Sequence, residues 1–159
     1  MTKSETDTIF QSEHTPLKVT FLVLSGSSLM CAASAIDPLR AANRIMGRTA
    51  FDWRTVSADG SPAVTTSGLP IAVSGRFDTR ERTDMIAVIG GFGARDNPDT
   101  RLLSGIGRAA RAARAYGGIE AGSWLIARAG LLEGRAATTH WEDMEDFSAA
   151  FPDTDVRPD

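Results

Sequence analysis

One segment constrains the fold of this chain more than any other: Gly118 to His140, with the sequence GIEAGSWLIARAGLLEGRAATTH. Its pattern predicts a short apolar strand, a sharp turn at EAGS, a helix and a return through RAATTH. A strand that turns sharply into a helix displays one side chain at the top of a sheet, where many hydrolases hold a nucleophile. The displayed residue here is Glu120, a carboxylate in a place where chemistry usually needs a thiol or a hydroxyl.

The rest of the chain continues this alternation of strand and helix. Strands are predicted over residues 18–24, 51–58, 84–91, 116–119 and 135–140. Helices are predicted over residues 28–48, 99–115, 123–132 and 141–151. This order predicts the α/β class: a three-layer, flavodoxin-like sandwich with an open, mostly parallel sheet and helices on both faces. Ligands of such folds bind at the carboxyl ends of the strands, where the loops are SGSSLMC, GGFGAR, EAGSW and HWED.

Local features refine these elements. Pro38 interrupts the first helical pattern and predicts a kinked helix or two abutting helices. Residues 63–73 predict a small hairpin arm that turns near Ser67 and Gly68. The three-residue spacing of Arg108, Arg111 and Arg114 predicts a solvated face rather than a nucleic-acid patch. The last helix is predicted to turn four side chains inward: Trp141, Met144, Phe147 and Phe151.

Composition excludes several classes of protein. A chain of 159 residues fits one domain, and its net charge of -3 gives no global attraction to nucleic acid or to an anionic membrane. The lone cysteine, Cys31, excludes an internal disulfide and fits a reducing compartment. The chain shows neither a signal-peptide core nor an apolar run that could cross a bilayer, so the predicted location is cytoplasmic. Polar residues 1–16 predict a flexible leader before a domain over residues 17–159.

Three motifs in the right order resemble one protein family. The stretch GSWLIARAGLLEGRAATTHW closely resembles the N-terminal sensor domains of certain AraC-type transcriptional regulators, which belong to the class I glutamine amidotransferase-like (PfpI-like) superfamily. SSLMCAASAIDPLRAANRI resembles the first helix of those regulators, and DMIAVIGGFG resembles their central strand and glycine loop. The resemblance covers residues 17–156, and three ordered motifs are more specific than any single one.

The resemblance implies a homodimeric sensor domain that binds a small nitrogenous effector such as carnitine, glycine betaine or arginine. In this family the domain continues further and is followed by a helix-turn-helix module. We therefore expect the domain to be truncated at its C-terminal end, and DNA to be contacted only through a module that these 159 residues lack. No membrane partner is expected.

The resemblance also assigns positions in the site. Catalytic members of the superfamily have a cysteine at the elbow, a histidine at the end of the next strand and an acidic residue on the first helix. These positions hold Glu120, His140 and Cys31 in this sequence, so the thiol and the acid are exchanged. Because the regulators generally lose the catalytic set, the resemblance implies a catalytically inactive domain.

The candidate ligand-binding residues are Cys31, Gly91, Glu120, Trp124, His140 and Trp141. A carboxylate flanked by aromatic rings suits a cationic group, and glycine-loop amides suit an anionic one. Each residue type also has a structural alternative: a carboxylate at a helix start, a hydrogen-bonded histidine, tryptophans in the core, a small buried cysteine, or glycines that permit a turn. No metal is expected, because His140 and Glu120 with the distant His14 make a poor ligand set, and no cofactor is expected either.

Two other functions remain open from the sequence. The first is an enzyme of the same superfamily, a hydrolase, hydratase or glyoxalase-like protein that uses Cys31 or Glu120. The second is a pure dimerisation scaffold with a vestigial pocket.

Overall fold

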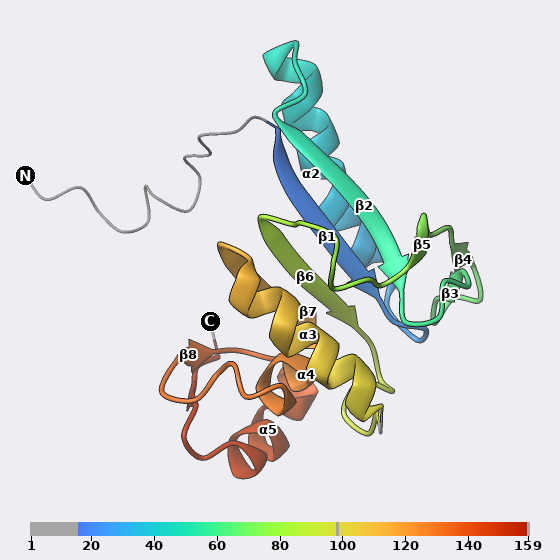
Figure 1. The fold of residues 1–159 in the computed structure, drawn as a ribbon. Helices are drawn as coiled ribbons and strands as arrows, with labels where there is room; N and C mark the ends of the chain where they lie inside the picture. Colours follow the sequence, from blue (N-terminus) through green and yellow to red (C-terminus); the bar gives the residue numbers. More distant parts are fainter. Residues whose placement is uncertain (1–15, 98, 159) are drawn as a thin grey trace, which may run out of the picture.

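A parallel sheet of five strands forms the centre of the molecule (Figure 1). The computed structural model describes residues 16–97 and 99–158. The strand order is β5-β2-β1-β6-β7, and every neighbouring pair is parallel. The strands are β1 (Leu17–Val23), β2 (Phe51–Ser57), β5 (Gly75–Arg76), β6 (Met85–Gly90) and β7 (Ala115–Glu120). The predicted α/β, flavodoxin-like class is confirmed.

Helices cover both faces of the sheet. They are α2 (Leu29–Met46), α3 (Thr100–Ala112), α4 (Gly122–Arg128) and α5 (Met144–Ala150), with a 3-10 turn η1 (Trp141–Asp143) before α5. Side chains of β1 alternate between two apolar clusters: Val19, Phe21 and Val23 pack on the α2 side, and Leu22 packs with α3 and α4. A strand buried on both faces explains the continuous apolar run VTFLV, since both faces of a parallel sheet are covered.

The capping residues explain where two helices begin and end. The Ser28 side chain accepts the Cys31 N–H at the start of α2, and Gly47, at φ 63°, ends the helix. Asp99 accepts the N–H groups of Arg101 and Leu102 at the start of α3. Pro38 lies inside α2, which is one continuous helix rather than two. The helix over residues 123–132 is shorter than predicted and ends at Arg128, before Gly130 turns the chain at φ 71°.

The predicted strand over residues 135–140 is wrong in length and in place. Only β8 (Ala136–Ala137) is extended, and it pairs with β9 (Asp155–Val156) in a separate two-stranded sheet. The reason is local: the Gly134 N–H donates to Asp153 O at 2.8 Å, which holds this segment beside the end of the chain. The predicted hairpin is confirmed as β3 (Ala63–Val64) with β4 (Pro70–Ile71), turning at Gly68 with φ 80°.

The last helix also differs from its prediction. Phe147 is fully buried, but Trp141 is 75% exposed. The segment begins as a 3-10 turn, and the tighter winding takes Trp141 out of the inward stripe that α5 presents. The predicted leader, residues 1–16, lies outside the described residues except for Pro16. No helix of the described chain is long and apolar enough to cross a membrane.

Candidate functional site

Loops from three neighbouring strands meet at the carboxyl edge of the sheet. The chain after β1 bridges the chain after β6 at Ser27 and Gly91. The buried Ser27 hydroxyl contacts Leu24 O at 2.5 Å and Ile89 O at 2.9 Å and can donate to either. Gly90 pairs with Glu120, so the elbow after β7 lies at the same level. The predicted gathering is confirmed for SGSSLMC, GGFGAR and EAGSW. It is wrong for HWED as a loop of this sheet, because the strand before it, β8, belongs to a separate sheet.

Glu120 occupies a sharp elbow between β7 and α4. Its φ is 58°, which makes it the one non-glycine residue with a positive φ in the described chain. A side chain in this region costs about 1–3 kcal/mol and persists only where the surroundings enforce it. Gly122, two residues further on, permits the elbow to pack closely against β6, because an added Cβ would lie 2.0 Å from Val88 O. The sequence prediction of a sharp turn that displays Glu120 is confirmed.

The carboxylate of Glu120 has an unsatisfied oxygen. Oε2 is buried and has no hydrogen-bond partner among the described residues. The oxygen therefore does not accept the amides that begin α4. Leaving a buried polar atom without a partner costs about 1–3 kcal/mol, and more for a charged group. A buried, unpartnered carboxylate oxygen at a loop edge is chemically suited to a ligand that carries a positive charge or N–H donors.

Cys31 lies beside this carboxylate, on the first turn of α2. Burial raises the pKa of the Cys31 thiol, and a hydrogen bond with Ser28 lowers that pKa. The negative charge of Glu120 and a hydrogen bond between the thiol and the Glu120 side chain raise it again. The net pKa lies above the ordinary value of a cysteine. A thiol reacts as its thiolate, so Cys31 is a weaker nucleophile at neutral pH than an ordinary cysteine. It is half-buried rather than fully buried.

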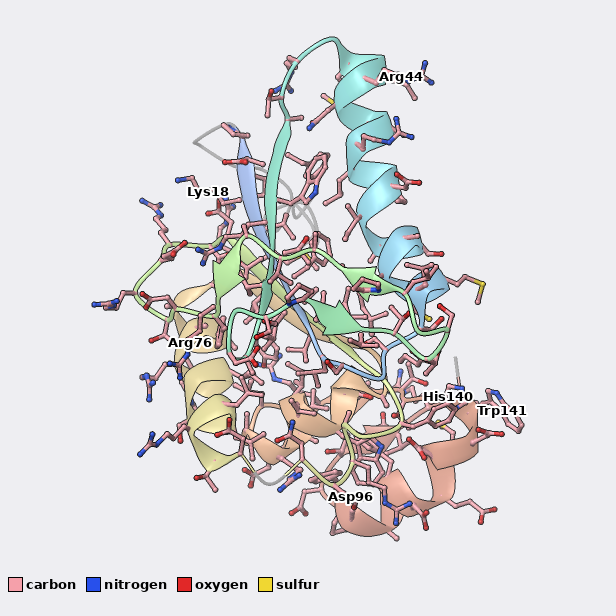
Figure 2. The ribbon with its side chains drawn as sticks, turned by 90° about the vertical axis from the view of Figure 1, so that its right-hand side faces the viewer. Lys18, Arg44, Arg76, Asp96, His140 and Trp141 are labelled. Carbon is pink, nitrogen blue, oxygen red and sulfur yellow. The ribbon has the colours of Figure 1, made fainter. Side chains whose placement is uncertain are left out.

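His140 and Trp141 stand next to each other before α5 (Figure 2). The Nδ1 atom of His140 accepts the Glu142 N–H at 3.3 Å, so His140 caps the 3-10 turn. Its ring lies edge-on to Phe92 at 6.2 Å between centroids, and 5.8 Å from the ring of Trp141. Phe92 is 74% exposed and comes from the glycine loop after β6. The described contacts therefore join three aromatic rings at this edge of the molecule.

Trp124 lies elsewhere, in the core. It is 3% exposed, and its ring packs edge-on against Phe147 at 5.0 Å and Phe151 at 5.6 Å. The indole Nε1 donates to Asp143 Oδ2 at 3.0 Å, which satisfies its one polar group. The structure thus favours the core alternative for Trp124, and we leave it out of the proposed ligand set.

Gly91 has a packing requirement of its own. A Cβ at this position would lie 1.8 Å from Gly26 O, so only glycine permits the bridge to the loop after β1. Its carbonyl accepts the Ala94 N–H at 2.8 Å, which closes a tight turn. These contacts give Gly91 a structural role, and its amide as an anion ligand stays a prediction.

The structure brings Cys31 to Glu120, and Phe92 to His140 and Trp141. Sequence reasoning missed Phe92, although one large apolar side chain in the otherwise small loop GGFGAR was a signal for it. It also missed Arg95, which pairs with Asp146 and stacks 5.2 Å from the centroid of Trp124. The described residues contain no group of three or more His, Cys, Asp or Glu that could hold a metal ion.

Comparison with known proteins shows which family and which proteins this chain is similar to. The profile of the DJ-1/PfpI family matches residues 17–156. The HTH-type transcriptional regulator GbdR of Pseudomonas aeruginosa is 36% identical over 137 residues, which are 86% of this chain and 37% of that protein. The HTH-type transcriptional regulator GlxA of Rhizobium meliloti is 32% identical over 141 residues, 88% of this chain and 44% of that protein. The chain spans less than half the length of either regulator.

A solved structure agrees with these matches. The crystal structure of an AraC family transcriptional regulator from Pseudomonas putida is similar with a TM-score of 0.78 and 26% identity. The similarity covers 91% of this chain and 77% of that chain.

Proposed function

The chain belongs to the DJ-1/PfpI family, and from that premise we propose that it forms the ligand-sensing and dimerisation domain of an AraC-type transcriptional regulator. The names of its relatives support this proposal, since GbdR and GlxA are HTH-type transcriptional regulators. In this account DNA is contacted through a helix-turn-helix module of the kind named in those relatives, and residues 17–156 supply the response to an effector.

One observation carries the proposal: Glu120 holds the displayed position of the elbow, and its buried Oε2 has no partner among the described residues. A cationic effector removes the cost of that oxygen, and a charge-assisted contact stabilises a complex by about 1.5–3 kcal/mol. The proposed effector is a small nitrogenous metabolite of the carnitine, glycine betaine or arginine kind.

The aromatic rings at the same edge support a cationic effector. Phe92 and Trp141 are exposed, and the His140 ring lies between them. A cation over an aromatic face gains about 0.5–2 kcal/mol, depending on how far it is desolvated. The proposed ligand set is therefore Glu120 for charge, with Phe92, His140 and Trp141 for ring contacts.

The proposed domain is catalytically inactive. A carboxylate is a weak nucleophile toward amides, and Glu120 stands where the catalytic members of the superfamily have their cysteine. The thiol of Cys31 does not replace it, because its pKa is raised by burial and by Glu120.

A ligand screen combined with a turnover assay tests the proposal. Residues 1–159 are mixed with carnitine, glycine betaine, arginine and neutral analogues, and thermal unfolding is followed for each. We expect at least one of the three metabolites, each of which carries a cationic group, to raise the unfolding temperature and remain unchanged after long incubation. Consumption of amide or 2-oxoaldehyde substrates by wild type, lost in Cys31→Ser, contradicts the proposal and favours an enzyme.

A further inference from the structure

A cavity lies away from the elbow, between the segment around β5 and the outer side of α3. Its volume is about 740 Å³. That volume falls within the range of about 300–1,000 Å³ that holds small-molecule ligands. Six of the lining residues bear on what the cavity can bind: Arg76, Phe77, Asp78, Asp99, Arg101 and Arg108. Glu120 does not line it, and Figure 2 shows Arg76 and His140 at opposite sides of the molecule in that view.

Arginines face this cavity from both walls. Arg76 comes from β5, and Arg101 and Arg108 come from α3. The two helix residues are seven apart, which places them on one face, about 10 Å from each other along the axis. A guanidinium group offers planar, paired N–H donors that match carboxylate and phosphate oxygens.

The carboxylates of the same cavity are already engaged. Asp78 pairs with Arg80 at 2.6 Å, and Arg80 lowers the pKa of Asp78 to about 2. The Asp99 carboxylate accepts the first amides of α3 at 2.9 and 3.0 Å. Glu81 pairs with Arg54.

No ion pair among the described residues joins Arg76, Arg101 or Arg108 to a carboxylate, so the cavity keeps an excess of positive charge. The Nε atom of Arg76 donates to Ala58 O at 3.2 Å, and no other hydrogen bond of the Arg76 side chain is found among residues 16–97 and 99–158.

Apolar contacts shape the floor between the two walls. Leu102 is 6% exposed, and Phe77 packs against the core cluster that contains it. Gly105 lets the Phe77 ring approach α3, because an added Cβ would lie 3.3 Å from that ring. The cavity thus combines an apolar floor with guanidinium groups on two walls, and guanidinium groups match carboxylate and phosphate oxygens.

We propose that this cavity binds a small organic anion with at least two negative groups, carboxylates or phosphates. The groups of such a ligand bridge the β5 wall and the α3 wall. The site is independent of the proposed effector site, because the two have no residue in common. The sequence prediction of a solvated face named Arg108, Arg111 and Arg114. The proposed site gives Arg108 a ligand and leaves the prediction for the other two arginines unchanged.

Calorimetric titration with pyrophosphate and with citrate at low ionic strength tests the proposal. The double variant Arg101→Gln/Arg108→Gln, the cavity variant, removes two positive charges from the lining of the cavity. The control variant Arg44→Gln/Arg111→Gln removes two positive charges from residues that do not line it. We expect saturable binding to wild type. Affinity should fall by about tenfold or more in the cavity variant and change by less than about twofold in the control variant. Arg76→Gln, on the opposite wall, is expected to weaken binding as well. This second cavity variant leaves α3 unchanged.

Several results would overturn the proposal. The first is the absence of saturable binding to wild type. The second is an equal loss of affinity in the cavity variant and the control variant, since that result means a general effect of charge. Binding of duplex DNA without binding of either small anion would assign the arginines to nucleic acid instead. Glu120→Gln separates the two sites: it is expected to keep full affinity for pyrophosphate, and loss of that affinity would place the anion at the elbow.

Discussion

The thiol of Cys31 and the carboxylate of Glu120 lie side by side, and the negative charge of Glu120 raises the pKa of the thiol. The carboxylate comes from the elbow between β7 and α4, and the thiol comes from the first turn of α2. In the proposed function, the carboxylate at the elbow accepts a cationic group of the effector and performs no catalysis.

The Cys31–Glu120 contact predicts how the thiol titrates. Burial and Glu120 raise the pKa of Cys31, and Ser28 lowers it. Alkylation by iodoacetamide, followed by mass spectrometry across pH, should therefore have its midpoint above that of an ordinary cysteine. Glu120→Gln should move the midpoint to lower pH, and Ser28→Ala should move it to higher pH. A midpoint that stays in place in both variants would mean that neither side chain acts on the thiol.

The buried Trp124 and the exposed Trp141 should differ in their effect on stability. Trp124→Ala empties a packed core position and should lower the free energy of unfolding by about 3–5 kcal/mol. Trp141→Ala changes a side chain that is 75% exposed and should stay within about 0.5 kcal/mol. Urea denaturation measures both. A small effect of Trp124→Ala would contradict its assignment to the core and return it to the ligand set.

Trp141 should matter for ligand affinity instead. If its exposed ring contacts a quaternary ammonium group, Trp141→Ala should weaken binding of such a ligand by about twofold to thirtyfold. Trp141→Phe keeps an aromatic face and should recover most of the affinity. Titration of glycine betaine or carnitine against the three proteins decides this. Equal affinities would remove Trp141 from the site.

The proposed dimer predicts a two-fold assembly of residues 1–159. Regulators that act on paired half-sites commonly place two copies about a two-fold axis. Apolar side chains exposed on α2, Met30 at 73% and Ile45 at 78%, offer surface that an interface can bury. Sedimentation velocity at high micromolar concentration should show a dimer. A strict monomer under these conditions would contradict dimerisation through this part of the chain.

Hydrophobic patterns predicted the long helices and strands well, because burial of one or both faces produces a clear repeat of apolar residues in the sequence. The strands β1 and β6 and the helices α2 and α3 lie within a few residues of their predicted bounds. The strands β5 and β9 have two residues each, too short to leave a period, and the sequence missed them. The 3-10 turn that exposes Trp141 was missed for a similar reason, since a change of winding over three residues shifts the inward face.

Some features of the site could be predicted from the sequence and others could not. Small residues at EAGS signalled the elbow at Glu120, and the exchange with Cys31 followed from the resemblance. Which of two tryptophans near helix starts is buried depends on the tertiary packing of Phe147 and Phe151, which no local pattern reveals. The arginine-lined cavity combines β5 with α3, and pairing β5 into the sheet requires the three-dimensional structure.

The measurement that tests the central claim most directly is calorimetric titration of cationic metabolites into wild type, Glu120→Gln and Glu133→Gln. Glu120→Gln keeps the shape of the side chain and removes its charge, and Glu133→Gln removes an exposed carboxylate after α4 as the matched control. The account predicts saturable binding of a betaine- or guanidinium-type ligand to wild type, a loss of about tenfold to a hundredfold in Glu120→Gln, and unchanged affinity in Glu133→Gln. Equal affinity of wild type and Glu120→Gln would contradict it, because the carboxylate at the elbow would then serve the turn and not a ligand.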